Sequence, residues 1–171
     1  LMAGSSTRTP AERVREALRS LVVQRRIFLR GIDGGRPDDP GGCGWELRGA
    51  EWEEPRGAAE CLGFTDGQSV WLLPEATHAA VTGQARRADD PMDLTSRGMG
   101  EALADARVIR VERTGDGRRA AVRKRLAGTQ IRVWETTTAW LFGDDDAAPS
   151  ALAACWLCST PVVDRVCTMP R

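Results

Sequence analysis

The chain has 171 residues, with 24 acidic and 24 basic side chains and an apolar content of 42%. This length suits one domain with a sizeable core and a small extension. No apolar run approaches the roughly 20 residues that cross a bilayer, and the first ten residues lack the pattern of a signal peptide. Five cysteines, an odd number in a chain of this length, argue against a secreted disulfide framework. We therefore expect a cytoplasmic protein with no membrane contact.

The charge is strongly segregated along the chain. Residues 107–132 hold nine basic and two acidic side chains, a net charge of +7, so the rest of the chain carries −7. Such a basic segment attracts polyanions, because binding releases the counterions that surround them. The sequence therefore predicts a surface that meets nucleic-acid phosphates or an acidic partner.

The first predicted element is a helix from Pro10 to about Arg26, after a flexible leader over residues 1–9. Thr9 is a suitable N-cap, Pro10 suits the first helical position, and Glu12 can complete a capping box. Short strands are predicted at 27–29 and 45–47, and the Gly-rich and Pro-rich stretches after them are predicted loops, the second over 49–59.

A hairpin and two helices follow. Residues 61–64 and 69–73 flank an Asp-Gly turn. Pro74 opens a helix to about Thr82, with Gly83 as its C-cap, and Thr95 or Ser96 caps a third helix that ends near Ala106. His78, the single histidine, has no nucleophile beside it and is interpreted as a packing or surface residue.

Three basic strands are predicted at 107–113, 118–126 and 130–134, forming a sheet whose outward side chains make a basic wing. Charged residues on exposed strands also deter edge-to-edge aggregation, and that reading stays open beside phosphate contact. The predicted nucleic-acid-binding residues are Arg97, Arg110, Arg118, Arg119, Arg123, Lys124, Arg125 and Arg132.

The last predicted segment is a partly ordered C-terminal extension over 143–171. Its Cys155, Cys158 and Cys167 could bind zinc, but a structural zinc site needs four ligands. The fourth would have to come from distant residues, namely Cys43, Cys61 or His78. The chain also contains no phosphate-binding loop motif of the G-x-x-x-x-G-K-[ST] type. We therefore predict no metal, no cofactor and no enzymatic activity.

Three runs carry a family resemblance, residues 63–81, 94–109 and 113–134. In order and spacing they resemble the C-terminal domain of actinobacterial plasmid and phage replication proteins, which are primase-polymerases and helicase-type ATPases. The resemblance extends over roughly 10–142. It departs from the family at Leu73, where an Asp usually caps the helix, and at Gly100–Ala102, where an aromatic and basic residues are usual.

The resemblance implies an α+β, winged-helix-like domain with three main helices, small antiparallel hairpins and a three-stranded basic wing. We expect a non-enzymatic accessory domain that holds duplex or forked DNA with weak sequence preference, beside other subunits of a replication complex. The alternative is an interaction or oligomerisation module of a replication protein that does not touch DNA. A small hydrolase or metal enzyme is the third reading, and no triad or metal spacing supports it.

Overall fold

A computed structural model of the protein describes residues 8–115 and 117–143. Its helices are α1 (Pro10–Val23), α2 (Pro74–Arg87), α3 (Ser96–Asp105) and α4 (Thr138–Phe142). Its strands are β1 (Ile27–Gly31), β2 (Glu46–Arg48), β3 (Glu51–Glu53), β4 (Glu60–Thr65), β5 (Ser69–Leu72), β6 (Glu112–Thr114), β7 (Gly117–Arg119), β8 (Val122–Leu126) and β9 (Thr129–Thr137). This mixture confirms the predicted α+β class.

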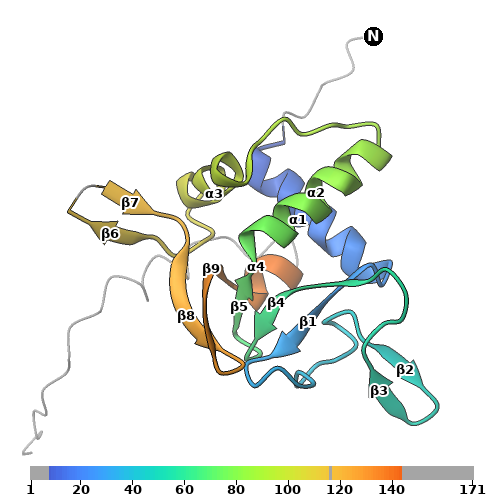
Figure 1. Ribbon diagram of the computed structural model, residues 1–171. Coiled ribbons are helices and arrows are strands. Elements are labelled where there is room, and N and C mark those ends of the chain that lie inside the picture. Colours follow the sequence, from blue (N-terminus) through green and yellow to red (C-terminus); the bar gives the residue numbers. More distant parts are fainter. Residues whose placement is uncertain (1–7, 116, 144–171) are drawn as a thin grey trace, which may run out of the picture.

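One five-stranded sheet organises the domain, in the order β1-β4-β5-β9-β8 (Figure 1). The β1–β4 pair is parallel, and the other pairs are antiparallel. The backbone N–H of Ala127, just after β8, donates a hydrogen bond of 2.8 Å to the carbonyl of Ile32, just after β1. The two ends of the strand order therefore meet, which means that the sheet is strongly curled.

The two faces of the sheet bury different residues, because neighbouring side chains on a strand point to opposite faces. Val70, Leu72 and Trp134 belong to the main core, which is completed by apolar residues of all four helices. Trp71 and Val133, one position away on the same strands, form a smaller cluster with apolar residues of β8. The helices lie on the first face (Figure 1).

The predicted helix starts are confirmed. Thr9 accepts a hydrogen bond from the Glu12 N–H while the Glu12 carboxylate accepts from the Thr9 N–H, which is the expected capping box. Thr95 caps α3 through the N–H of Gly98. Leu73 precedes α2 without any side-chain cap, as its apolar side chain requires.

The predicted end of α2 is wrong. Gly83 lies inside the helix, which continues to Arg87. Val81 and Ala85 are one turn apart and both are buried, so packing carries the helix through the glycine. The N-terminal helix ends at Val23, and the predicted 49–59 loop contains β3. The described residues contain four helices, one more than the three expected, because the sequence analysis did not predict α4.

The three-stranded basic wing is also wrong. Residues 107–111 form no strand, since Arg107 has a left-handed φ of 58°. β6 and β7 form a separate hairpin, while β8 and β9 belong to the main sheet. The predicted strand over 118–126 is interrupted at Ala120 and Ala121, whose half-buried side chains pack against the main core.

Other sequence predictions lie outside the described residues. They are the leader over 1–7 and most of the C-terminal extension, including Cys155, Cys158 and Cys167. In the part of the chain that the structure describes, no helix combines the length and apolarity that a bilayer span requires.

Two helical glycines provide a matched test of the packing. A Cβ at Gly100 would lie 2.9 Å from Nε1 of Trp134, whereas a Cβ at Gly83 would approach nothing closer than 3.9 Å. Gly83→Ala should therefore stabilise the protein by up to about 1 kcal/mol, the gain in helix propensity. Gly100→Ala should destabilise it by roughly 1–2 kcal/mol, because overpacking outweighs the same gain. Urea unfolding measures both, and stabilisation by both variants would refute the close approach of α3 to Trp134.

Candidate functional site

A groove of about 1330 Å³ lies between the first turns of α2 and α3 on one side and β7, β8 and β9 on the other. Small residues from the helices and from the link between β7 and β8 leave this space open, and Gly100 and Trp134 line it. The charged residues that line the groove are Glu75, Arg97, Glu101, Glu112, Arg118, Arg119, Arg123 and Arg132.

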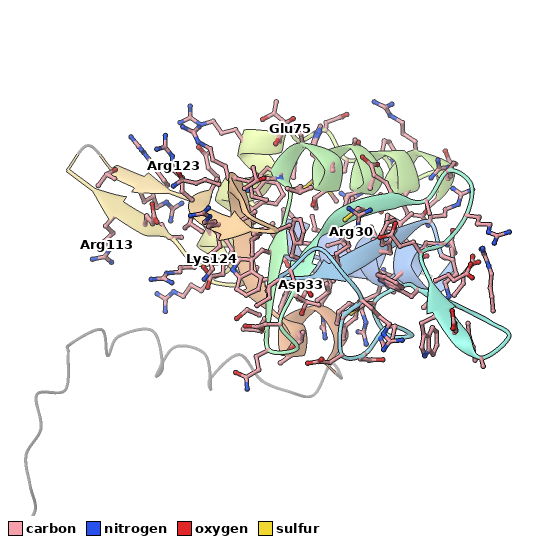
Figure 2. The ribbon with its side chains drawn as sticks, turned by 60° about the horizontal axis from the view of Figure 1, so that its bottom comes forward. Arg30, Asp33, Glu75, Arg113, Arg123 and Lys124 are labelled. Atoms are coloured by element: carbon pink, nitrogen blue, oxygen red, sulfur yellow. The ribbon has the colours of Figure 1, made fainter. Side chains whose placement is uncertain are left out.

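Strand alternation directs the arginines of β8 and β9 into the groove. Val122 and Leu126 are buried on the side of the sheet away from the helices. Arg123 therefore points to the helix side, where its cross-strand partner is Arg132. Figure 2 shows Arg123 toward the same side as Glu75 of α2. The first turns of α2 and α3 line the other side of the same space, so the helix-facing side of β8 and β9 forms one wall of the groove.

The structure brings together five of the eight residues predicted from the sequence. They are contributed by three separate parts of the chain: the first turn of α3, the β6–β7 hairpin and the β8–β9 hairpin. The five residues are Arg97, Arg118, Arg119, Arg123 and Arg132.

The other three predicted residues lie elsewhere. Arg110 is outside the strands, with Nη1 at 3.7 Å from the carboxylate of the buried Glu135. The Lys124 ammonium lies over the ring of Trp71, 4.8 Å from its centroid, on the opposite side of the sheet. Nε of Arg125 donates a hydrogen bond of 3.3 Å to the Gly128 carbonyl. These three residues do not line the groove, and their predicted contact with nucleic acid stays a prediction.

Two of the five groove arginines are neutralised by carboxylates. Nε of Arg97 lies 2.9 Å from Oε1 of Glu101, one turn further along α3. Arg118 forms an ion pair with Asp105 at the end of α3. These pairs are exposed and contribute little to stability, but they reduce the charge that the groove offers to a ligand.

Arg119, Arg123 and Arg132 remain without a hydrogen bond or ion pair among the described residues. All three are exposed. Arg123 and Arg132 stand directly opposite each other on antiparallel strands, an arrangement that is unfavourable for like charges. Glu75 and Glu112 also line the groove, and Glu112 stands opposite Arg119 on the β6–β7 hairpin. The groove therefore has a net positive charge that these carboxylates balance only in part.

Sequence reasoning missed the helix wall of the groove. Oγ of Ser96 donates a hydrogen bond of 2.8 Å to Oε1 of Glu75, which joins the first turns of α2 and α3. Because Gly100 has no side chain, the indole of Trp134 can lie close to the backbone of α3. The signal for this second contact was present, because a glycine inside an amphipathic helix indicates a close approach.

The groups with shifted pKa values lie away from the groove. Burial, followed by the charge of Asp39, raises the pKa of the Cys43 thiol to about 11. Burial also raises the pKa of Cys61. Nε2 of His78 lies 2.6 Å from the Leu94 carbonyl and so ties α2 to the segment before α3. Over residues 8–115 and 117–143, no group of three or more His, Cys, Asp or Glu side chains is arranged to hold a metal ion.

Comparison with known proteins identifies no relative of this chain. No family model, no curated protein sequence and no solved structure matches the chain. The chemistry of the groove is therefore the basis on which a function can be inferred.

The facing arginines can be tested in the free protein. Arg132→Gln removes one of two like charges that oppose each other, so it should raise the free energy of unfolding at low salt by roughly 0.2–1 kcal/mol. The gain should shrink in high salt, where the repulsion is screened. Arg125→Gln is the matched control, because Arg125 stands opposite the neutral Gln130. Urea unfolding at two salt concentrations measures the effect, and equal responses of the two variants would contradict the repulsion.

Proposed function

We propose that this protein binds nucleic acid without catalysis and holds duplex DNA by its phosphates in the arginine-lined groove. The observation that carries the proposal is the convergence of Arg119, Arg123 and Arg132 in one groove without a side-chain hydrogen bond or ion pair to a described residue. Guanidinium groups suit phosphate oxygens because they can donate two parallel hydrogen bonds. An anion in the groove would also relieve the repulsion between Arg123 and Arg132.

The composition of the groove favours contact with the backbone over reading of bases. Trp134, the one aromatic residue among its lining residues, is only 2% exposed, so it cannot serve as a stacking platform for single-stranded bases. Among the described residues that line the groove there is no Asn or Gln, and these side chains are the usual readers of adenine. Phosphate contacts position a protein without specifying sequence. We therefore expect weak sequence preference and strong dependence on salt.

The finer expectations from the sequence belong to this proposal. A helix pair, α2 and α3, is followed by the basic β8–β9 hairpin, and this order supports a winged-helix-like arrangement within the larger five-stranded sheet. If the resemblance to replication proteins reflects a shared role, the domain is an accessory part of a cytoplasmic primase or helicase complex that acts on duplex or forked DNA. Any ATPase or primase activity would then belong to another part of that machinery.

The test combines three substitutions in the groove with three matched substitutions outside it. Arg119→Gln, Arg123→Gln and Arg132→Gln together should lower affinity for a 20-base-pair duplex at least about tenfold. They should also reduce the slope of log K against log salt by about 2–3, since roughly one counterion is released per phosphate contact. The control variant carries Arg8→Gln, Arg36→Gln and Arg86→Gln, which remove the same charge from exposed positions that do not line the groove.

Fluorescence anisotropy across about 50 to 200 mM salt separates the outcomes. A loss confined to the groove variant supports the proposal. Equal behaviour of the two variants would mean that any binding follows net charge, and the groove proposal would then be rejected.

The alternative function is assembly with other copies of the chain. Residues 32–60 hold eight acidic and three basic side chains, a net charge of −5, and include the β2–β3 hairpin. This hairpin lies at the far side of the domain from β6 and β7 (Figure 1). A basic groove on one copy could therefore meet an acidic hairpin on the next. A head-to-tail contact of this kind repeats along an assembly unless it closes into a ring.

Light scattering across a salt series tests assembly without DNA. The assembly reading predicts oligomers at low salt that dissociate as salt is raised, because the contact is between opposite charges. It also predicts that the groove variant stays monomeric throughout. A wild-type protein that is monomeric at low salt would exclude this alternative.

A further inference from the structure

A second hollow, of about 430 Å³, lies at the opposite end of α2 from the groove. It is formed where the end of α1 and the start of β1 meet the segment before β4 and the second half of α2. Its apolar residues are Leu21, Ile27, Ala58, Ala59, Ala79 and Ala80. Arg25, Arg26, Arg56, Arg87 and Glu60 also line it, so it is a cationic hollow with an apolar floor.

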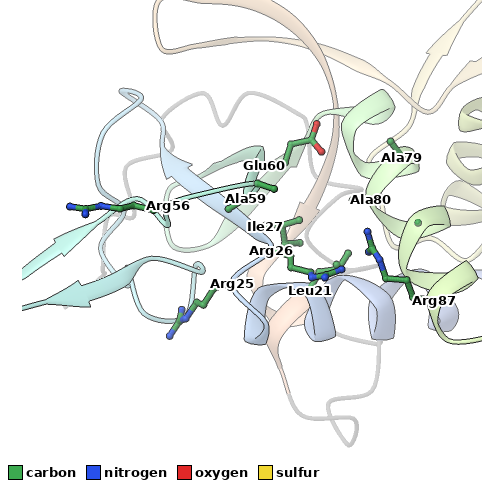
Figure 3. A pocket seen from close by; sticks show the side chains of 12 residues that line it. Leu21, Arg25, Arg26, Ile27, Arg56, Ala59, Glu60, Ala79, Ala80 and Arg87 are labelled. Carbon is green, nitrogen blue, oxygen red and sulfur yellow. The ribbon is translucent and has the colours of Figure 1, made fainter.

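Two of its four arginines are directed to it, and two are held away. Nη1 of Arg25 donates a hydrogen bond of 2.8 Å to the Gly41 carbonyl. Nη2 of Arg56 lies 3.4 Å from Oε2 of Glu53, and both side chains point away from α2 in Figure 3. Arg26 and Arg87 instead extend toward each other across the hollow (Figure 3).

The Arg26–Arg87 pair has no hydrogen bond or ion pair from either side chain to a described residue. Both residues are exposed. Among the described residues, Glu60 is the one carboxylate that lines the hollow, so the charge of the pair is balanced only in part. Arg87 is also suited to the last turn of α2, because a helix C-terminus favours cations. Arg86 also belongs to the last turn of α2 but does not line the hollow.

The hollow and the groove lie along one stripe of α2. Ala76, Ala80, Gly83 and Arg87 are spaced by four, three and four residues, so they share a face of the helix. Ala76 lines the groove, and the other three line the hollow. Ala76 and Arg87 are 11 positions apart in this helix, so the parts of α2 that line the two sites are separated by about 16 Å along the helix axis. On this face the positions before Arg87 carry only small residues, Ala76, Ala80 and Gly83, which are half-buried.

We propose that the Arg26–Arg87 pair is a second phosphate site for the same DNA duplex that occupies the groove, so that the DNA lies along α2. This inference rests on the proposed function of the groove. A phosphate bound between the two guanidinium groups would neutralise their converging charges. A duplex that lies along α2 would reach both sites, since about 16 Å of helix axis is about the length of five base pairs at 3.4 Å per pair.

The experiment compares two double variants in the full chain. Arg26→Gln with Arg87→Gln should weaken binding of a 20-base-pair duplex about tenfold and reduce the salt slope by about 1–2. The control, Arg36→Gln with Arg86→Gln, removes the same charge and keeps both phosphate sites. It should therefore change the affinity and the salt slope much less. All four residues are exposed, and urea unfolding checks that both variants fold as the wild type does.

The groove variant is measured beside them to separate the two claims. If the Arg26 and Arg87 variant binds like its control while the groove variant loses affinity, the second site is rejected and the groove function stands. That result would also be expected if a free phosphate ion, and not DNA, occupied the hollow. If neither variant differs from its control, both proposals fail.

Discussion

The close contact between α3 and β9 is the constraint on which the rest of the groove depends. A Cβ at Gly100 would lie 2.9 Å from Nε1 of Trp134, so a larger residue there would push the helix away from the sheet. Trp134 itself is buried in the main core. The contact therefore fixes the first turn of α3, with Arg97, relative to the arginines of β8 and β9. Gly100 lowers the helix propensity of α3, but its lack of a side chain lets α3 lie against Trp134 and so positions one wall of the groove.

The same residues that form the groove oppose the stability of the free protein. Arg123 and Arg132 face each other across β8 and β9. Arg119 adds a third charge that forms no ion pair with a described residue, although Glu112 stands opposite it on the β6–β7 hairpin. By contrast, the arginines outside the groove are often satisfied locally, for example Arg30, whose pKa is raised first by its hydrogen bond to Glu54. Proteins commonly retain such unfavourable arrangements where function needs them. Arg26 and Arg87 also lack an ion pair to a described residue, so the groove is distinguished by the three such arginines that line one space.

Sequence patterns predicted the local elements well, but they predicted less well how these elements pack into the tertiary structure. The capping residues Thr9 and Thr95 and the Asp-Gly hairpin are short-range signals, and all are confirmed. The parallel pairing of β1 with β4 and the curling of the sheet depend on contacts between distant residues, which no local pattern records. For the site, the basic segment indicated the correct region. The position of Lys124 over Trp71 and the pairing of Arg118 with Asp105 could not be predicted, because they depend on strand register and on the placement of α3.

The most direct test of the central claim follows individual arginine side chains while DNA is added. In an NMR titration with duplex DNA, the Nε–Hε signals of Arg119, Arg123 and Arg132 should shift early and together, because these side chains contact the phosphates. The signals of Arg36 and Arg125, which do not line the groove, should change little. Shifts spread evenly over the exposed arginines, or centred on Arg48 and Arg56 beside the acidic hairpin, would contradict the groove as the binding site.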